Sequence, residues 1–408
     1  MRVTTVFRRL LRVTQLVVQG IRFESGGLVL SVRPSWRKPR CGGCGSRAAG
    51  YDQRPSRRWR HLGWGDWSWY LEYAPRRVEC PECGIRGEQV PWAVSGSRFT
   101  QEFEEMVAYL AQVTDKTQVT RLTGIAWSTV GSIVERVVQR NLDPERLKGI
   151  RRIGIDEFSY RSRHRYVTVV VDHDRRRVVW AGKGNTAETL GIFFDALGSD
   201  GLAELESITI DMAPGYRKAI EERAPHVRVV FDRFHVQRMA SDALDKVRRE
   251  QLRQVRGTDE GREIYRSRFA LLKNPWNLRR SESEKLNNIQ RTNAPLYRAY
   301  LLKETLAQAL DYKQPWRAER ALREWLSWAC RSKLRPFVRV SRAIRKHLDG
   351  ILAYVHERLT NGYLEGINNR LRMIARRAYG FHGHEALIAM AFLCCGGIEL
   401  QPRLPGPT

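Results

Sequence analysis

Long apolar runs are absent from this sequence of 408 residues. No stretch of about 18 consecutive apolar residues occurs, which excludes an ordinary membrane-spanning helix. The opening stretch, MRVTTVFRRLLRVTQLVVQG, is basic and only partly apolar, without the unbroken apolar core and small-residue cleavage site of a signal peptide. We therefore expect no membrane partner and a cytoplasmic location.

Acidic residues are scarce relative to basic ones. The chain has 44 Asp and Glu residues against 71 Lys and Arg residues, which gives a formal net charge of +27. Such a charge indicates a polyanionic partner, with nucleic acid as the leading candidate and a ribosomal or membrane-surface protein as the alternative. A hydrophobic fraction of 42% excludes global disorder, and the length allows about two to four domains.

Cysteines are few and odd in number, which argues against a framework of disulfide bonds. Four of the seven form the pairs Cys41-Gly-Gly-Cys44 and Cys80-Pro-Glu-Cys83, and a glycine follows each pair. In a protein that is not secreted, this pattern is typical of a zinc knuckle in which four thiolates bind one Zn²⁺. Two unrelated reduced thiol pairs are the alternative.

Two β-rich stretches surround these pairs. Residues 16–33 predict a hairpin that turns at SGG (25–27) beside the cysteine region. RRWRHLGWGDWSWYLEY (57–73) predicts an aromatic strand pair that forms the body of the zinc ribbon. We expect its tryptophans to be core residues rather than base-stacking platforms, namely Trp59, Trp64, Trp67 and Trp69. We assign residues 1–95 to an N-terminal β region with a structural zinc site.

Helical periodicity begins near residue 100. A short helix over 116–122, a turn at Gly124 and a second helix from Ser128 form the pattern of a helix-turn-helix. An ordinary helix pair is the alternative, but the basic charge favours DNA binding. We assign residues 96–148 to this domain. The residues placed to face the DNA major groove are Ser128, Thr129 and Ser132.

From residue 151 the pattern predicts five short strands and two helices in the order β-β-β-α-β-α-β, which is the order of an RNase H-like fold. The strands are expected at 153–155, 166–171, 178–180, 208–210 and 227–231, and the helices at about 186–198 and 215–223. Residues 233–358 are basic and helical in pattern, with prolines as punctuation, and we interpret them as a large helical insertion.

A further helix within residues 359–383 presents two different faces. One face is apolar, and the other carries Glu365 together with Arg372 and Arg376. We expect the apolar face to pack on the sheet. The two arginines are placed to bind DNA phosphates, and a solvated basic face or ion pairs with the acids are the alternatives.

Acidic residues end three of the predicted strands. Asp156 and Asp211 would end neighbouring strands, and Glu365 would reach them from the helix that crosses the sheet. Converging carboxylates repel one another, a conflict that Mg²⁺ or Mn²⁺ removes by binding their oxygens. Two such ions can promote in-line displacement at phosphorus. Structural turn formers or caps are the alternative, and Asp232 stays open as a supplement or replacement.

Several stretches resemble one family, namely GIDEF, ITIDMAPGY, VVFDRFHVQRMASDALDKVRRE, LLKNPWNL and NGYLEGINNRLRMIARRAYGFHG. They are similar to bacterial insertion-sequence transposases of the ISL-three group, whose N-terminal modules resemble the CGGCG…CPECG ribbon and the helix-turn-helix here. The resemblance covers nearly the whole chain. It implies a DDE transposase with an RNase H-like catalytic domain over 149–408 and the acidic triad Asp156, Asp211 and Glu365.

The resulting expectation is a multidomain α/β DNA transposase that binds insertion-sequence ends and catalyses metal-dependent strand cleavage and strand transfer. Its partners would be double-stranded DNA, as terminal inverted repeats and as target, and it would act as a homodimer or higher oligomer in the bacterial nucleoid. Two alternatives remain, a catalytically inactive DNA-binding regulator and a structure-specific nuclease of the same fold.

Overall fold

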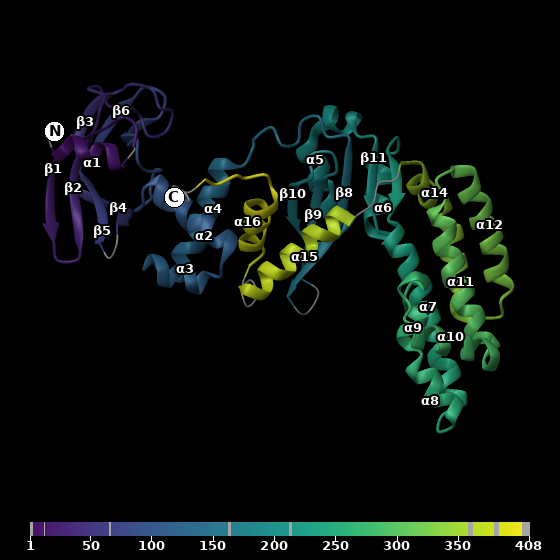
Figure 1. Cartoon of the computed structure of the whole chain (residues 1–408). Coiled ribbons are helices and arrows are strands. Elements are labelled where there is room, and N and C mark those ends of the chain that lie inside the picture. The colour runs from purple at the N-terminus through teal and green to yellow at the C-terminus, as the bar shows by residue number, and fades with distance from the viewer. Residues whose placement is uncertain are drawn as a thin grey trace. The chain divides into compact units, whose positions relative to one another are not determined.

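The computed structural model describes residues 3–11, 13–64, 67–161, 165–211, 214–357, 362–378 and 383–401. The chain divides into two compact units, residues 1–142 with 397–408, and residues 143–396 (Figure 1). No helix within the described ranges is long and apolar enough to cross a membrane.

A four-stranded sheet opens the first unit, after helix α1 (Val3–Leu11). Its order is β1-β2-β5-β4, with strands β1 (Leu16–Glu24), β2 (Gly27–Pro34), β4 (Arg57–Trp64) and β5 (Trp67–Tyr73). The predicted β1–β2 hairpin is confirmed, and Gly26 adopts the positive φ of 107° that its turn requires.

The aromatic strands β4 and β5 do not form the body of the zinc ribbon, so that prediction is wrong. β5 pairs in parallel with β2, because the apolar faces of the two hairpins combine into one core. Trp59 and Trp69 are buried there, as predicted. Trp64 and Trp67 are 75% and 48% exposed, because they lie at the end of the β4–β5 hairpin, beyond the core.

The cysteine pairs belong to a separate three-stranded sheet in the order β3-β6-β7. Its strands are β3 (Ala49–Gln53), β6 (Arg76–Cys80) and β7 (Gly84–Gly87). The glycines that follow the pairs, Gly45 and Gly84, have φ of 76° and 69°, a left-handed conformation that favours glycine. Each CxxC pair therefore ends in a tight turn.

Three helices complete the first unit, α2 (Gln101–Val113), α3 (Lys116–Thr123) and α4 (Trp127–Asn141). Thr100 caps α2 by accepting a hydrogen bond from the Phe103 N–H, and Asp115 caps α3. Gly124, at φ 66°, ends α3 and allows the sharp turn into α4. The predicted helix-turn-helix geometry is confirmed.

A buried carboxylate joins α2 to α4. The Glu104 side chain is fully buried, and its oxygens accept hydrogen bonds from Arg136 at 2.7 and 2.9 Å, Arg140 at 3.2 Å and Ser97 at 2.7 Å. A buried charge is tolerated only when its oxygens are satisfied in this way. This network therefore fixes the position of α4 on α2.

The second unit is built on a five-stranded sheet in the order β10-β9-β8-β11-β12. Its strands are β8 (Arg152–Arg161), β9 (Arg165–Asp172), β10 (Arg177–Lys183), β11 (Ser207–Ile210) and β12 (Arg228–Phe231), and helices α5 (Ala187–Glu204) and α6 (Pro214–Arg223) connect the last three. β8 to β10 are antiparallel, whereas β8, β11 and β12 are parallel. The predicted order of strands and helices is confirmed.

Asp156 does not end the first strand, so this detail of the prediction is wrong. β8 continues to Arg161, because its second half stays paired with β9, where Asp156 lies opposite Val169. The parallel partner β11 is shorter and ends at Ile210. Asp156 therefore lies beside the point where the parallel pairing stops.

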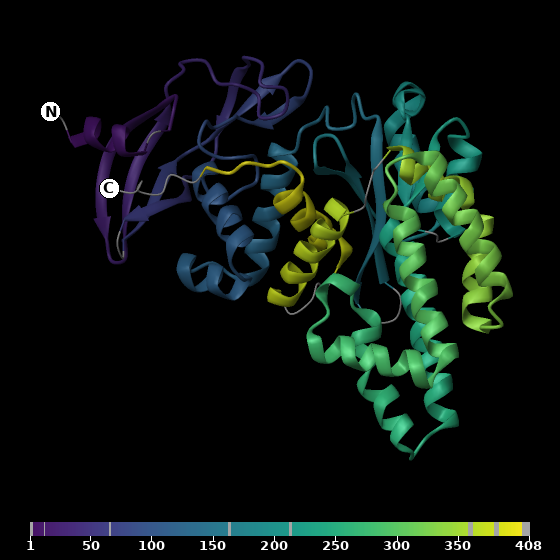
Figure 2. The same ribbon diagram turned by 45° about the vertical axis from the view of Figure 1, so that its right-hand side comes forward.

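Different helices pack on the two faces of this sheet. Ile153 and Ile155 of β8 pack in one core with Phe193 of α5. Side chains alternate along a strand, so Asp156 points to the opposite face. That face carries α15 (Gly362–Arg377) on β8 and α16 (His384–Cys395) on β10 (Figures 1 and 2).

Between β12 and α15 the chain is helical from Arg233 to Glu357, as its pattern predicts. The helices are α7 (Arg233–Gln254), α8 (Asp259–Arg266), α9 (Arg268–Leu272), α10 (Arg280–Thr292), α11 (Ala294–Asp311), α12 (Pro315–Arg331), α13 (Arg335–Lys346) and α14 (Leu348–Glu357), with a 3₁₀ turn η1 (Pro275–Asn277). Prolines occupy the first turn of η1, α11, α12 and α13, where a missing N–H costs no hydrogen bond.

Candidate metal and DNA-binding sites

Three aspartates lie in one row across the parallel part of the sheet. The register of β8 against β11 pairs Gly154 with Thr209, and two residues further along it sets Asp156 beside Asp211. The ladder of β11 and β12 ends one residue before Asp211 and Asp232, which are therefore neighbours as well. Residues opposite each other in a register point to the same face of the sheet, so the row gathers carboxylates on one face.

The surroundings of the Asp156 carboxyl act on its pKa in opposite directions, with a net rise. Burial raises its pKa, and the charge of Asp211 adds to this rise. The Glu157 N–H, which donates to Asp156 Oδ1 at 2.8 Å, and the charges of His235 and Arg372 act in the opposite direction. Asp156 is therefore an acid whose ionised form depends on a few donors and on nearby positive charge.

Glu157, the next residue of β8, is another acid with a perturbed pKa, and sequence reasoning did not single it out; alternation along the strand places its side chain on the sheet face opposite to that of Asp156. Burial, followed by the charges of Asp211 and Asp156, raises the pKa of Glu157 to about 7. A carboxyl group with such a pKa can accept or release a proton near neutral pH. The signal in the sequence was the adjacent pair Asp156-Glu157, of which only the first acid was assigned a role.

Helix α15 reaches the acidic row through Asn368, another residue that sequence reasoning missed. Asn368 Nδ2 donates a hydrogen bond of 2.6 Å to Asp156 Oδ2. The Asn368 side chain is buried, and its Oδ1 has no hydrogen-bond partner within the residues the structure describes. The apolar face that was expected to pack on the sheet is buried, and Asn368 is buried with it, whereas its neighbour Asn369 is exposed.

Glu365 lies one turn before Asn368 on α15, and its side chain is exposed. Asp156, Asp211 and Glu365 do not bring one carboxylate oxygen each within 4.8 Å of the other two. Among the described residues, four cysteines do place one ligand atom each within that distance of one another. The structure thus brings Asp156 and Asp211 together and places Glu365 on the helix above them.

The two arginines on the same helix are exposed. Arg372 Nη1 donates to Asn369 Oδ1 at 2.8 Å, and the charge of Arg372 lowers the pKa of Asp156. Arg376 lies one turn further along α15. Both guanidinium groups are therefore accessible to a phosphate beside the acidic row.

Asp232 occupies the N-cap position of α7, but its side chain makes no capping hydrogen bond there. It is buried, and it completes the row beyond Asp211. The alternative role of a helix cap, which the sequence leaves open for the strand-end acids, is therefore not filled by the Asp232 side chain. The hypothesis that it supplements the metal site rests on this position beside Asp211.

The four cysteines of the CxxC pairs converge, as predicted. Cys41, Cys44, Cys80 and Cys83 have sulfurs that all lie within 4.8 Å of one another, with 3.5 Å between Cys44 and Cys80. A tetrahedral ZnS₄ centre with Zn–S bonds of about 2.3 Å needs sulfurs about 3.8 Å apart, which this cluster matches. The geometry fits a closed structural zinc site.

Backbone groups favour the ionised sulfurs of this cluster. N–H groups of Cys44 and Gly43 lower the pKa of Cys41 to about 7. Hydrogen bonding with Cys44, burial and the neighbouring sulfurs raise the pKa of Cys83 to about 12. Four thiolates cannot ionise together at this distance without a cation among them.

The residues predicted to read DNA lie at the start of α4. Ser128 and Ser132 are exposed and Thr129 is half-buried, on the helix that follows the Gly124 turn. Next to them, the Lys116 ammonium lies 4.1 Å from the centre of the Trp127 ring. The N-terminal turn of α4 is therefore accessible, as a recognition helix requires.

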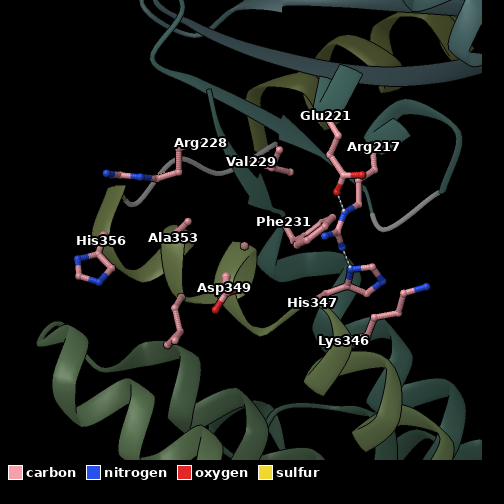
Figure 3. A pocket seen from close by; sticks show the side chains of 12 residues that line it. Arg217, Glu221, Arg228, Val229, Phe231, Lys346, His347, Asp349, Ala353 and His356 are labelled. Atoms are coloured by element: carbon pink, nitrogen blue, oxygen red, sulfur yellow. Dashed lines mark hydrogen bonds and ion pairs between the residues drawn. The ribbon is translucent and has the colours of Figure 1, made fainter. Parts of the chain in front are cut away.

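A cavity of about 470 Å³ lies beside the edge strand β12, between α6 and α14. Figure 3 shows Arg217 pointing at both Glu221 and His347, to which it donates hydrogen bonds of 2.6 and 2.8 Å. A guanidinium only donates, so His347 Nδ1 is the acceptor, and burial lowers the pKa of His347. This mixed-charge cavity contains none of the aspartates of the row.

Comparison with known proteins agrees with this arrangement. A transposase family model matches residues 153–391, a helix-turn-helix model of transposase family ISL3 matches 88–138, and a zinc-finger model of the transposases of IS204, IS1001, IS1096 and IS1165 matches 37–83. The transposase for insertion sequence element IS1557 of Mycobacterium tuberculosis is 39% identical over 440 residues, covering 100% of this chain and 98% of its own. The transposase for IS1001 of Bordetella parapertussis is 30% identical over 367 residues, covering 89% of this chain and 90% of its own. The chain belongs to the transposase family ISL3.

Proposed function

We propose that this chain is a DNA transposase that binds the ends of an insertion sequence and cuts and joins DNA strands with the help of a divalent metal ion. The observation that carries the proposal is the row of Asp156 and Asp211 on parallel strands, covered by the helix that bears Glu365. Two relatives named as transposases for insertion sequence elements, with high coverage, support the same activity.

Asp156, Asp211 and Glu365 are the proposed metal ligands of an RNase H-like catalytic domain. The donor set fits Mg²⁺ or Mn²⁺, because both prefer oxygen ligands and neutralise crowded carboxylates. The raised pKa of Asp156 also fits a site for a cation, and so does the buried Oδ1 of Asn368, which accepts no hydrogen bond from the described residues. When bound, the ion would activate water and stabilise the charge that develops at the phosphodiester.

The protein's own groups orient the reactants around that site. The Glu157 N–H and the Asn368 amide each hold one oxygen of Asp156, so its carboxylate keeps one orientation. Arg372 and Arg376 bind the phosphates next to the scissile bond, since a guanidinium contacts phosphate oxygens bidentately. Together these groups would hold the phosphodiester beside the acidic row.

Recognition of the element ends is assigned to the N-terminal modules. The β region with one structural zinc covers residues 1–95, the helix-turn-helix covers 96–148, and the catalytic domain covers 149–408 with its insertion at 233–358. Ser128, Thr129 and Ser132 are the proposed base-reading residues, because base contacts carry the sequence information that phosphate contacts lack. The partners are terminal inverted repeats and target DNA, bound by a dimer or larger assembly in the bacterial nucleoid.

Cleavage of DNA that carries the element's own ends tests the proposal. The purified chain should nick an end-bearing duplex in Mg²⁺ and leave a scrambled-end duplex of the same length uncut. The exposed position of Glu365 favours one alternative, a regulator that binds the ends without cutting them. End binding without nicking at any Mg²⁺ concentration would support that alternative, and cutting of branched DNA regardless of ends would indicate a nuclease.

A further inference from the structure

The far end of the helical insertion carries a groove of about 610 Å³ between α7 and α8. Helix α8 and the end of α7, which line it, lie away from the sheet in both views (Figures 1 and 2). Nine residues line it, and none of them is acidic. They are Arg249, Leu252, Arg253, Arg256, Gly257, Gly261, Arg262, Tyr265 and Arg266. Five guanidinium groups around one groove make it strongly positive.

Two of the five arginines form ion pairs with acidic side chains, and the other three do not. Arg249 pairs with Asp245 at 3.1 Å and Arg262 with Asp259 at 2.7 Å. Arg253, Arg256 and Arg266 are exposed and have no carboxylate partner among the residues the structure describes. Guanidinium groups held close together without such partners repel one another, a cost that an anion in the groove removes. The groove is therefore complementary to a polyanion.

The local backbone keeps the groove open and fixed. Gly257 adopts φ 89° in the turn after α7, and Thr258 then caps α8 by accepting a hydrogen bond of 3.1 Å from the Gly261 N–H. A side chain at Gly261 would collide with the Val255 carbonyl oxygen at 2.4 Å, so the two helices approach closely here. The arginines on both helices are thereby held around one space.

The length of α7 relates this groove to the acidic row. α7 starts directly after Asp232 and has 22 residues, which corresponds to about 33 Å. A duplex rises about 3.4 Å per base pair, so roughly ten base pairs would span that length. A duplex that extends about one helical turn beyond a scissile phosphate at Asp156 could therefore reach the groove.

We propose that this groove binds the phosphate backbone of duplex DNA without regard to sequence, at a site separate from the helix-turn-helix and the acidic row. The occupant is DNA because three exposed arginines and the exposed Tyr265 hydroxyl suit phosphate oxygens, and the groove presents no carboxylate to accept hydrogen bonds from base edges. The proposal rests on the proposed DNA transposase function and adds a second region that binds the duplex.

The test compares three full-length variants by fluorescence anisotropy on an end-bearing duplex and a random duplex. Arg253→Gln/Arg256→Gln/Arg266→Gln should weaken binding to both duplexes by about 10- to 500-fold at about 0.1 M salt. The slope of log K against log salt should become shallower by about one unit for each phosphate that the variant no longer binds. The corresponding triple lysine variant should retain most of the affinity, because lysine keeps the positive charge that phosphate binding needs.

The charge-matched control is Lys313→Gln/Arg317→Gln/Arg331→Gln, which removes three exposed cations on and beside α12, outside the groove. It should change affinity by less than about threefold. Equal losses of affinity in the groove and control variants would overturn the proposal, since they would show that affinity depends on the net charge of the chain and not on the position of the arginines. An unchanged groove variant, an equal loss in the lysine variant, or a loss confined to the end-bearing duplex would also overturn it. Because binding is measured without Mg²⁺, a chain that failed to cut DNA would leave this result unaffected.

Discussion

The hydrogen bond from Asn368 to Asp156 is the contact through which α15 acts on the acidic row. Asn368→Ala removes the Nδ2 donor that lies 2.6 Å from Asp156 Oδ2, and among the described residues it leaves the Glu157 N–H as the remaining donor to that carboxylate. A hydrogen bond to a charged group contributes about 1.5–3 kcal/mol. The removed donor stabilises the ionised form, so the pKa of Asp156, which burial already raises, should rise further.

Metal binding requires the ionised carboxylate, so losing this hydrogen bond should weaken the binding of Mg²⁺ by a similar free energy. A change of about 1.5–3 kcal/mol corresponds to an increase of about 10- to 150-fold in the Mg²⁺ concentration that gives half-maximal cleavage. Raising the pH should restore part of the cleavage in the variant, because the carboxyl then ionises more completely. Affinity for end-bearing DNA, measured without metal, should be unchanged.

The neighbouring residue supplies a matched control. Asn369 has the same side chain on the same helix, but it is exposed and hydrogen-bonds Arg372. Asn369→Ala should therefore leave the Mg²⁺ requirement within about twofold of the original chain. Cleavage by both variants would be followed over a Mg²⁺ titration at several pH values. An unchanged Mg²⁺ requirement in Asn368→Ala, or equal shifts in the two variants, would refute the reasoning.

Four further outcomes follow from the structure. Cys80→Ser should lower the zinc content from about one ion per chain and expose residues 35–95 to proteolysis, and metal analysis that finds no zinc in the original chain would reject the site. Glu104→Ala should destabilise the first unit by about 3 kcal/mol in denaturant unfolding, because two arginines lose their buried partner, whereas Glu105→Ala on the exposed side should cost less than about 1 kcal/mol. Burial lowers the pKa of His173 below 6.5, so between the folded and the unfolded pKa the folded chain binds fewer protons than the unfolded chain. The free energy of unfolding should therefore fall as the pH drops below 6.5. His173→Gln should reduce this loss in unfolding midpoints recorded from about pH 8 to about pH 5. Arg372→Ala should weaken DNA binding with a salt slope about one unit shallower and leave Mg²⁺ affinity unchanged, whereas tighter Mg²⁺ binding with unchanged DNA binding would show that it pairs with the acids instead.

The sequence predicted the catalytic sheet well because its strands are short apolar runs separated by turn residues. The order of strands and the neighbouring positions of Asp156 and Asp211 followed from that pattern. The length of β8 was missed, although residues 157–161 alternate polar and aromatic side chains, a pattern that predicts a strand. The adjacent acids Asp156 and Glu157 were interpreted as the end of the strand, whereas pairing with β9 continues as far as Arg161.

Other parts of the site depend on packing that no single segment specifies. Asn368 and Asn369 differ by about 100° around α15, and only the packing of that helix on β8 decides which one meets Asp156. The aromatic strands β4 and β5 were expected beside the cysteines, yet their apolar face matches that of the β1–β2 hairpin. The sequence gives no sign that Glu104 is buried, because its arginine partners lie more than thirty positions away.

The central claim is that Asp156 and Asp211 hold the metal at which DNA is cut. The most direct measurement is Mg²⁺-dependent cleavage of end-bearing DNA by Asp156→Asn and Asp211→Asn, with Asp174→Asn as the control, since Asp174 is an acid of the same unit that pairs with Arg152. We expect both row variants to bind the ends normally and to lose cleavage by at least about a thousandfold, while Asp174→Asn keeps it. Cleavage by either row variant at the rate of the original chain would contradict the account.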